Sequence, residues 1–126
     1  MKGKIVVIKK VNLKDKLSLF QTYWDPKVVG ELNDQFVKLV KFKGEFVWHK
    51  HDNEDEMFLV INGSFDMHMR NKLITITEGE FIIIPRGIEH RPVANEEVHV
   101  LLFEPKTTIN TGDSGGEMTK IKLDNL

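Results

Sequence analysis

Apolar and polar residues alternate along most of the chain with the period of two that is typical of half-buried β-strands. The runs with strand character are 35–42, 46–51, 57–61, 64–70, 73–77, 81–84 and 98–103. Asn62-Gly63, between two of these runs, is the strongest hairpin signal in the chain. Six or more short strands joined by tight turns predict an all-β fold, either an antiparallel β-barrel or a two-sheet jelly roll.

The first 34 residues show a different pattern. The β-branched run 5–8 predicts an early strand. Asn12, followed by Asp15 three residues later, predicts a capped short helix over 13–20. Asp25-Pro26 repeats the signal and predicts a second helix over 26–32. We expect these one or two short helices to pack against the outside of the β core.

The apolar content falls from Thr107 onwards, and the last ten residues have no strong pattern. The segment 111–116 has the composition of an exposed loop. We therefore expect one domain over 1–126, with an N-terminal segment over 1–34, a barrel core over 35–104 and a C-terminal arm over 105–126. The arm is expected to be a surface arm or a frayed end.

Composition narrows the classes of function. The chain has 126 residues, of which 40% are hydrophobic and 29% charged, which excludes wholesale disorder. The 18 basic residues nearly cancel the 19 acidic ones, which disfavours nucleic acid as a partner. The absence of cysteine excludes disulfides and thiol catalysis. No apolar run is long enough for a membrane span or a signal peptide, so we expect a soluble cytoplasmic protein with no membrane partner.

His49 and His51 are the first candidates for chemistry. Side chains two apart on a strand point to the same face, about 6–7 Å apart along the backbone, so both imidazoles can reach one metal ion. Glu56 follows a polar turn at the start of the return strand, and His90 lies in a loop after an apolar run. The alternative is a solvated or packed histidine pair without a metal.

Three imidazoles and one carboxylate form a mixed nitrogen and oxygen donor set. It suits one divalent transition metal ion, Fe, Mn, Zn, Ni, Co or Cu, and is poor for Mg or Ca. Four protein ligands would leave two octahedral positions for water or substrate, which favours a working site over a structural one.

At these residues the chain resembles the cupin family, which has two linked motifs. Gly44, His49, His51, Glu56 and Gly63 match the first motif, although the spacer after Gly44 is one residue shorter than usual. Gly79, Pro85, Gly87 and His90 match the second motif at every spacing, but Ala94 stands where the motif has Asn, which occurs one residue later. The likeness covers Gly44 to Asn95.

The resemblance implies a small antiparallel barrel, the jelly roll also called a double-stranded β-helix, with one metal ion in its mouth. It implies His49, His51, Glu56 and His90 as ligands. Glu54 competes as the carboxylate, but the six-residue spacing to Gly63 favours Glu56.

A narrower likeness is to single-domain bacterial cupins that carry three local motifs. These are Trp48-His49-Lys50-His51, Glu89-His90-Arg91-Pro92 and Asn110-Thr111-Gly112-Asp113. Such proteins are often labelled mannose-6-phosphate isomerase-like or sugar-phosphate isomerase-like by similarity alone. We do not transfer that activity, because a fold does not fix a function.

Two further histidines are interpreted as structural. His68 alternates with Asp66 and Arg70 on a face that we expect to point outward, opposite apolar neighbours. His99 is expected to be a packed or interface histidine rather than a fifth ligand.

Arg86 and Arg91 flank His90 and leave two alternatives open. They bind an anionic substrate near the metal, or they form surface salt bridges with Glu89, Glu96 or Glu97. Phe46 and Trp48 share a face that we expect to point away from the histidine pair, toward the core or a dimer contact.

Three functions fit these expectations, and no catalytic residue can be named for any of them. A metal-dependent enzyme of isomerase or oxygenase type is favoured, acting on a small and possibly anionic metabolite. The alternatives are a non-catalytic small-molecule sensor or binding module, and a structural or storage protein. A homodimer that pairs through 5–8 is also expected, because exposed sheet edges must be covered.

Overall fold

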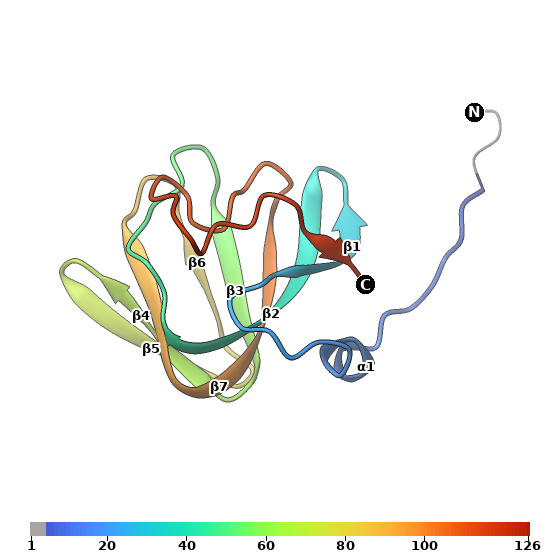
Figure 1. Cartoon of the computed structure of the whole chain (residues 1–126), viewed down its shortest axis with the longest axis horizontal. Helices are drawn as coiled ribbons and strands as arrows, with labels where there is room; N and C mark the ends of the chain where they lie inside the picture. Colours follow the sequence, from blue (N-terminus) through green and yellow to red (C-terminus); the bar gives the residue numbers. More distant parts are fainter. Residues whose placement is uncertain (1–4) are drawn as a thin grey trace.

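A computed structural model describes residues 5–126. It contains one helix, α1 (Leu13–Leu17), within that range, and most other elements are strands (Figure 1). The eight strands are β1 (Lys27–Leu32), β2 (Gln35–Glu45), β3 (Glu56–Asn62), β4 (Ser64–Met69), β5 (Lys72–Thr77), β6 (Phe81–Ile84), β7 (His90–Pro105) and β8 (Asp124–Asn125). The predicted all-β jelly-roll fold with a short N-terminal helix is confirmed.

The long strand β7 connects the two halves of the fold. Along one edge it pairs antiparallel with β2, from Gln35↔Pro105 to Glu45↔Val93. On its other edge, its first residues pair with β4 and its last with β3, and these strands continue to β5 and β6. The β2–β7 register shifts between Phe42 and Gly44, an irregularity of the kind at which paired strands bend.

The core lies between the sheets. It consists of apolar side chains on the inward-facing side of the strands: Val40, Phe42, Phe58, Val60, Phe65, Met67, Ile76, Ile84, Ala94, Val98, Val100 and Leu102. Each large apolar side chain buried there stabilises the fold by roughly 1.5–3 kcal/mol. Gly63, with φ of +89°, closes the β3–β4 hairpin, and a Cβ there would lie 3.1 Å from the Glu97 carbonyl oxygen.

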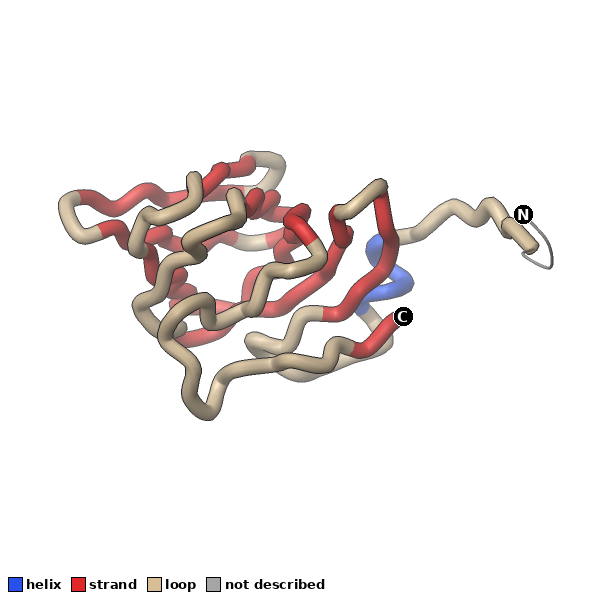
Figure 2. The backbone as a smooth tube through the Cα atoms, turned by 90° about the horizontal axis from the view of Figure 1, so that it is seen from above, coloured by secondary structure: helices blue, strands red, loops and turns tan. Residues whose placement is uncertain are grey.

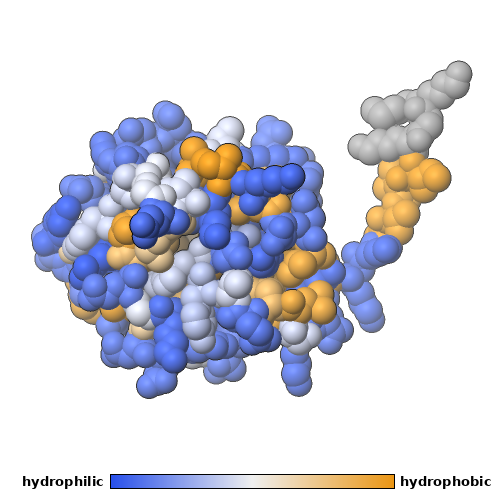
Figure 3. Space-filling model, in the orientation of Figure 1, coloured by the Kyte–Doolittle hydropathy of each residue, from blue (hydrophilic) through white to orange (hydrophobic). Residues whose placement is uncertain are grey.

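The N-terminal expectations are partly wrong. Met1–Lys4 lie outside the described residues, and 5–8 forms no strand in the structure. Its four side chains are 64–95% exposed, and the segment extends away from the body of the molecule (Figures 1 and 3). β-branched residues form a strand only when they pair with a partner edge, and 5–8 pairs with no strand of the described chain.

One predicted helix is confirmed in a shorter form and the other is wrong. Asn12 caps α1, its Oδ1 accepting from Asp15 N at 2.9 Å. Figure 2 shows α1 outside the strands, where Lys16 Nζ donates to the Leu126 carbonyl at 2.7 Å. The expected helix over 26–32 is instead β1, because its β-branched residues pair with β2 across a turn in which Asn33 adopts φ of +53°.

One other segment differs from expectation. The run 46–51 is extended but forms only an isolated bridge, His49↔His90, rather than a strand. The arm 105–126, expected to be a surface arm or a frayed end, is a surface arm. It crosses the open end of the sheets (Figure 1, red), buries Thr108 and Thr111, and ends in β8, parallel to β1.

Candidate metal centre

Four buried side chains converge at the open end of the sheets. His49 and His51 lie on the extended segment before β3, Glu56 begins β3, and His90 begins β7. The backbones of His49 and His90 hydrogen-bond to one another in both directions, at 3.1 and 2.8 Å. One potential ligand atom from each of the four residues lies within 4.8 Å of all the others.

Backbone carbonyls fix the tautomers of two imidazoles. His49 Nδ1 lies 2.9 Å from the Val47 carbonyl oxygen, and His90 Nδ1 lies 2.9 Å from that of Ile88. A carbonyl can only accept, so each Nδ1 carries the proton and each Nε2 keeps its lone pair. Histidine ligands of metals are oriented in this way.

The converging atoms have no hydrogen-bond partners of their own. His51 Nε2, His90 Nε2 and Glu56 Oε1 are all buried without one. The carboxylate oxygen lies 3.2 Å from His51 Nε2 and 3.4 Å from His90 Nε2. Buried acceptors that face one another are unfavourable unless a cation or proton lies between them. The donor set therefore fits a metal ion.

The protonation states also suit a metal. Burial, and next the neighbouring His90, lowers the pKa of His49 to about 4, so its imidazole is neutral at pH 7. Burial works against ionisation of Glu56, but His51, His90 and Glu104 outweigh it and hold its pKa well below the usual range. Glu56 is thus an anionic ligand, and the His49 imidazole beside it is neutral.

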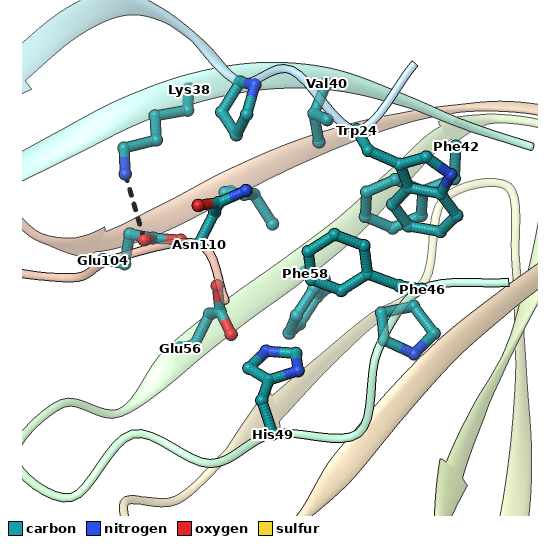
Figure 4. A pocket seen from close by; sticks show the side chains of 13 residues that line it. Trp24, Lys38, Val40, Phe42, Phe46, His49, Glu56, Phe58, Glu104 and Asn110 are labelled. Atoms are coloured by element: carbon teal, nitrogen blue, oxygen red, sulfur yellow. Dashed lines mark hydrogen bonds and ion pairs between the residues drawn. The ribbon is translucent and has the colours of Figure 1, made fainter. Parts of the chain in front are cut away.

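Sequence reasoning missed a buried pair next to this cluster. Lys38 Nζ lies 3.1 Å from Glu104 Oε2, and both side chains are almost completely buried (Figure 4). Burial, and next the charge of Glu56, raises the pKa of Glu104 well above the usual range, while Lys38 opposes this. The strand alternation could have identified this pair. Lys38 lies on the inward-facing side of β2 with Val40, and Glu104 lies on the inward-facing side of β7 with Leu102.

A narrow cavity of about 30 Å³ lies beside the cluster. Its polar side is formed by Lys38, His49, Glu56, Glu104 and Asn110 (Figure 4). Its apolar side includes Trp24, stacked on Phe42 at 4.4 Å and on Phe46 at 4.9 Å between ring centroids. Space of this size holds one or two water molecules, so a ligand must be small or must displace side chains.

Glu54, the competing carboxylate, lies outside the cluster. It accepts a hydrogen bond from Thr107 Oγ1 at 2.8 Å. His68 is half-buried on the outward face of β4, where its neighbour Asp66 accepts from Thr75 Oγ1 at 2.6 Å. His99 is also outside the cluster and lies 2.7 Å from the Glu97 carboxylate.

The two arginines beside His90 form surface ion pairs, but with other partners than expected. Arg86 pairs with Asp55 at 3.6 Å and Arg91 with Glu45 at 3.7 Å. Exposed pairs of this length contribute little to stability.

Phe46 lies in the core, as expected, but it does not point away from the histidine pair. Its ring lies edge-on to His49, with centroids 5.3 Å apart, because 46–51 lacks the regular alternation of a paired strand. The ring of Trp48 is instead covered by the guanidinium groups of Arg70 at 3.9 Å and Arg91 at 5.3 Å.

Known proteins resemble both the sequence and the fold. A solved structure of a cupin-2 domain containing protein from Shewanella frigidimarina is 46% identical, with a TM-score of 0.76, over 76% of this chain and 94% of that one. Protein NMB1881 from Neisseria meningitidis is 27% identical, with a TM-score of 0.72, over 78% of this chain and all of that one, 100%.

A curated relative, the uncharacterized protein YdbB of Bacillus subtilis, is 34% identical over 64 residues. That match covers 50% of this chain and 57% of the relative, so the chain spans little more than half the relative's length. Within residues 5–126, no helix has the length and apolar character needed to cross a membrane. The family model for the Cupin domain matches residues 37–104, more than half of the chain and all four clustered residues, and the chain therefore belongs to the cupin family.

Proposed function

We propose that this cupin binds one divalent transition metal ion through His49, His51, Glu56 and His90. The observation that carries the proposal is the set of buried, unpartnered acceptor atoms that face one another. Nitrogen and carboxylate donors suit Fe, Mn, Co, Ni, Cu or Zn. When bound, the ion would supply Lewis-acid chemistry to an oxygen of the ligand.

The ligand that we propose is a small metabolite with an anionic oxygen group. A divalent ion with Glu56 as the single anionic protein ligand has a surplus positive charge. Lys38, paired with Glu104, lies on the same side of the cavity. An anionic group balances that charge. The aromatic side chains opposite would contact the apolar part of the molecule, and the small cavity favours a compact one.

Metal content is the direct test of the proposed metal binding. Elemental analysis of protein purified without an affinity tag should find one transition metal ion per chain, and His90→Ala should remove most of it. A wild-type protein that retains no metal, and takes up none of Mn, Fe, Co, Ni, Cu or Zn, would refute the site.

The binding of an anionic metabolite is tested with the Co(II) form of the protein. Small mono- and dicarboxylates, such as lactate and oxalate, should change its visible absorption, whereas uncharged analogues such as glycerol should not. Conversion of one of these compounds, lost in His90→Ala, would make the protein an enzyme. Binding without conversion would make it a binding module.

A further inference from the structure

The Asn110-Thr111-Gly112-Asp113 motif lies directly against the segment that carries two of the four clustered residues. Lys50 N donates to Asp113 Oδ1 at 2.9 Å, and Asp113 N donates to the Lys50 carbonyl at 3.1 Å. Lys50 stands between His49 and His51, so the arm is hydrogen-bonded at the centre of the His-x-His pair.

These hydrogen bonds hold an edge that no strand covers. In an extended chain, the backbone groups of successive residues point to opposite edges. His49 pairs with His90 on one edge, and the His51 carbonyl accepts from Gly87 N at 2.8 Å. Both polar backbone groups of Lys50 point to the opposite edge, where the arm satisfies them. The segment is thus fixed on both sides without belonging to a regular strand.

Gly112 allows this close approach. Its φ is +52°, and a Cβ at this position would overlap the Lys50 carbonyl oxygen and lie 3.2 Å from Cδ2 of His49. The arm therefore packs against a histidine of the cluster itself, and a side chain at Gly112 would force the two segments apart.

The turn is held in place by its own contacts. Thr111 is completely buried, and its hydroxyl hydrogen-bonds to that of Thr119. Asn110 Nδ2 donates to the Met118 carbonyl at 2.9 Å, and Asn110 Oδ1 accepts from Lys120 N at 2.8 Å. Asn110 also reaches the cavity beside Glu56 (Figure 4). A turn anchored through Asn110 and Thr111 in this way can fix the position of a neighbouring segment.

We propose that the Asn110–Asp113 turn is a positioning element of the metal site, which holds the His49–His51 segment so that both imidazoles reach the ion. This inference rests on the proposed metal binding. Asp113 and Gly112 donate no ligand atom and act through the backbone of Lys50. Loss of such supporting contacts typically weakens metal affinity about 10–100-fold.

Two pairs of variants isolate this role. Asp113→Ala removes the acceptor for Lys50 N, whereas Asp113→Asn keeps an Oδ1 acceptor and should restore binding. Gly112→Ala introduces the clash, whereas Gly115→Ala places the same side chain at φ of +62° with nothing within 4 Å. Both alanines share the backbone strain, so their difference reports the contact with the metal-site segment.

The measurement is the Co(II) dissociation constant, by competition with a chromophoric chelator, together with the visible spectrum of the bound Co(II). Asp113→Ala and Gly112→Ala should weaken binding at least 10-fold and change the spectrum, while Asp113→Asn and Gly115→Ala stay within about 3-fold of wild type. The melting temperature of the metal-free variants reports folding separately. If Gly112→Ala does not fold, the Asp113 pair decides the question, because that side chain is exposed.

The outcomes separate the two proposals. A wild-type protein that binds no Co(II) refutes the metal site, and the positioning role with it. Wild-type binding with unchanged affinity and spectrum in Asp113→Ala refutes the positioning role alone. Weakening in Asp113→Ala without rescue by Asp113→Asn also refutes it, because the hydrogen bond would then not be the cause.

Discussion

The two ends of the jelly-roll interior are buried to the same extent but differ in chemistry. At the apolar end, Phe65 is 2% exposed and Met67 0%, and they pack against other apolar side chains. At the polar end, His90 is 0% exposed and Glu56 4%, and their functional atoms face other acceptors. Burial alone therefore does not distinguish the core from the site. The two differ in whether buried polar atoms without a hydrogen-bond partner are present. The apolar end stabilises the fold by itself, whereas the polar end needs a partner.

The largest expected effect concerns the apolar end. Phe65→Ala should lower the free energy of unfolding of the metal-free protein by about 3–5 kcal/mol, because it leaves a cavity against Phe42. Urea denaturation measures the change. Phe81→Ala is the matched control, since Phe81 is 60% exposed, and it should cost less than about 1 kcal/mol. Equal effects at the two positions would contradict the assignment of the core.

The next effect concerns the polar end and depends on pH. The pKa of His49 is lowered from 6.5 to about 4, so below pH 6.5 the unfolded chain binds a proton that the folded chain does not. Stability is therefore lost as the pH falls from 6.5 toward 4, by on the order of 3 kcal/mol.

Denaturation of the metal-free protein at several pH values checks this. The stability difference between wild type and His49→Gln should shrink by that amount between pH 7 and pH 4, since the variant lacks the titrating group. Parallel pH profiles for the two proteins would show that His49 titrates normally.

The third prediction concerns stabilisation of the polar end by a bound metal ion. Metal at about 100 times its dissociation constant should stabilise the protein by about 2.7 kcal/mol, and a chelator should reverse the gain. Glu56→Gln keeps the shape but removes the anionic ligand, so it should abolish most of this metal-dependent stabilisation. Glu54→Gln should leave it intact, because Glu54 bonds Thr107 outside the cluster. Equal metal content in the two variants, or loss only in Glu54→Gln, would mean that the carboxylate is wrongly assigned.

The smallest effect on the fold concerns apolar residues that lie outside the interior altogether. Ile5, Val6, Val7 and Ile8 are exposed, and the homodimer expected to cover them stays a prediction, as does the cytoplasmic location. Light scattering at micromolar concentration should give twice the 14.6 kDa of one chain. Val6→Lys combined with Ile8→Lys should reduce that mass to the monomer value and leave the melting temperature of the monomer unchanged. A wild-type mass near 14.6 kDa would refute the dimer.

The sequence predicted those regions of the fold that follow local rules. Strand runs such as 81–84, which coincides with β6, and the Asn62-Gly63 hairpin are determined by alternation and turn chemistry. The segments 5–8 and 26–32 were mispredicted, because strand or helix there is decided by whether a partner strand is available. Local pattern contains no information on that partner.

The candidate site shows the same division. The spacing of His49, His51, Glu56 and His90 pointed to a common position, and the structure brings these four residues together. Lys38 and Glu104 were missed because each stands alone among apolar neighbours. Only the β2–β7 register, with Lys38 opposite Leu102 and Glu104 opposite Phe36, brings them close enough to pair diagonally. The role of Asp113 lies in a backbone contact with Lys50, 63 residues away, which no residue-type pattern reveals.

The pairing of β2 with β7 also has a consequence for folding kinetics. Gln35 meets Pro105, and His49 meets His90, so the four clustered side chains come together only after long loops have closed. Such non-local topology slows folding, and we expect the cluster to form late, when most of the sheet is already assembled. A metal ion bound there would therefore leave the refolding rate nearly unchanged and slow unfolding instead. Its effect would be a longer lifetime of the folded state, not faster folding.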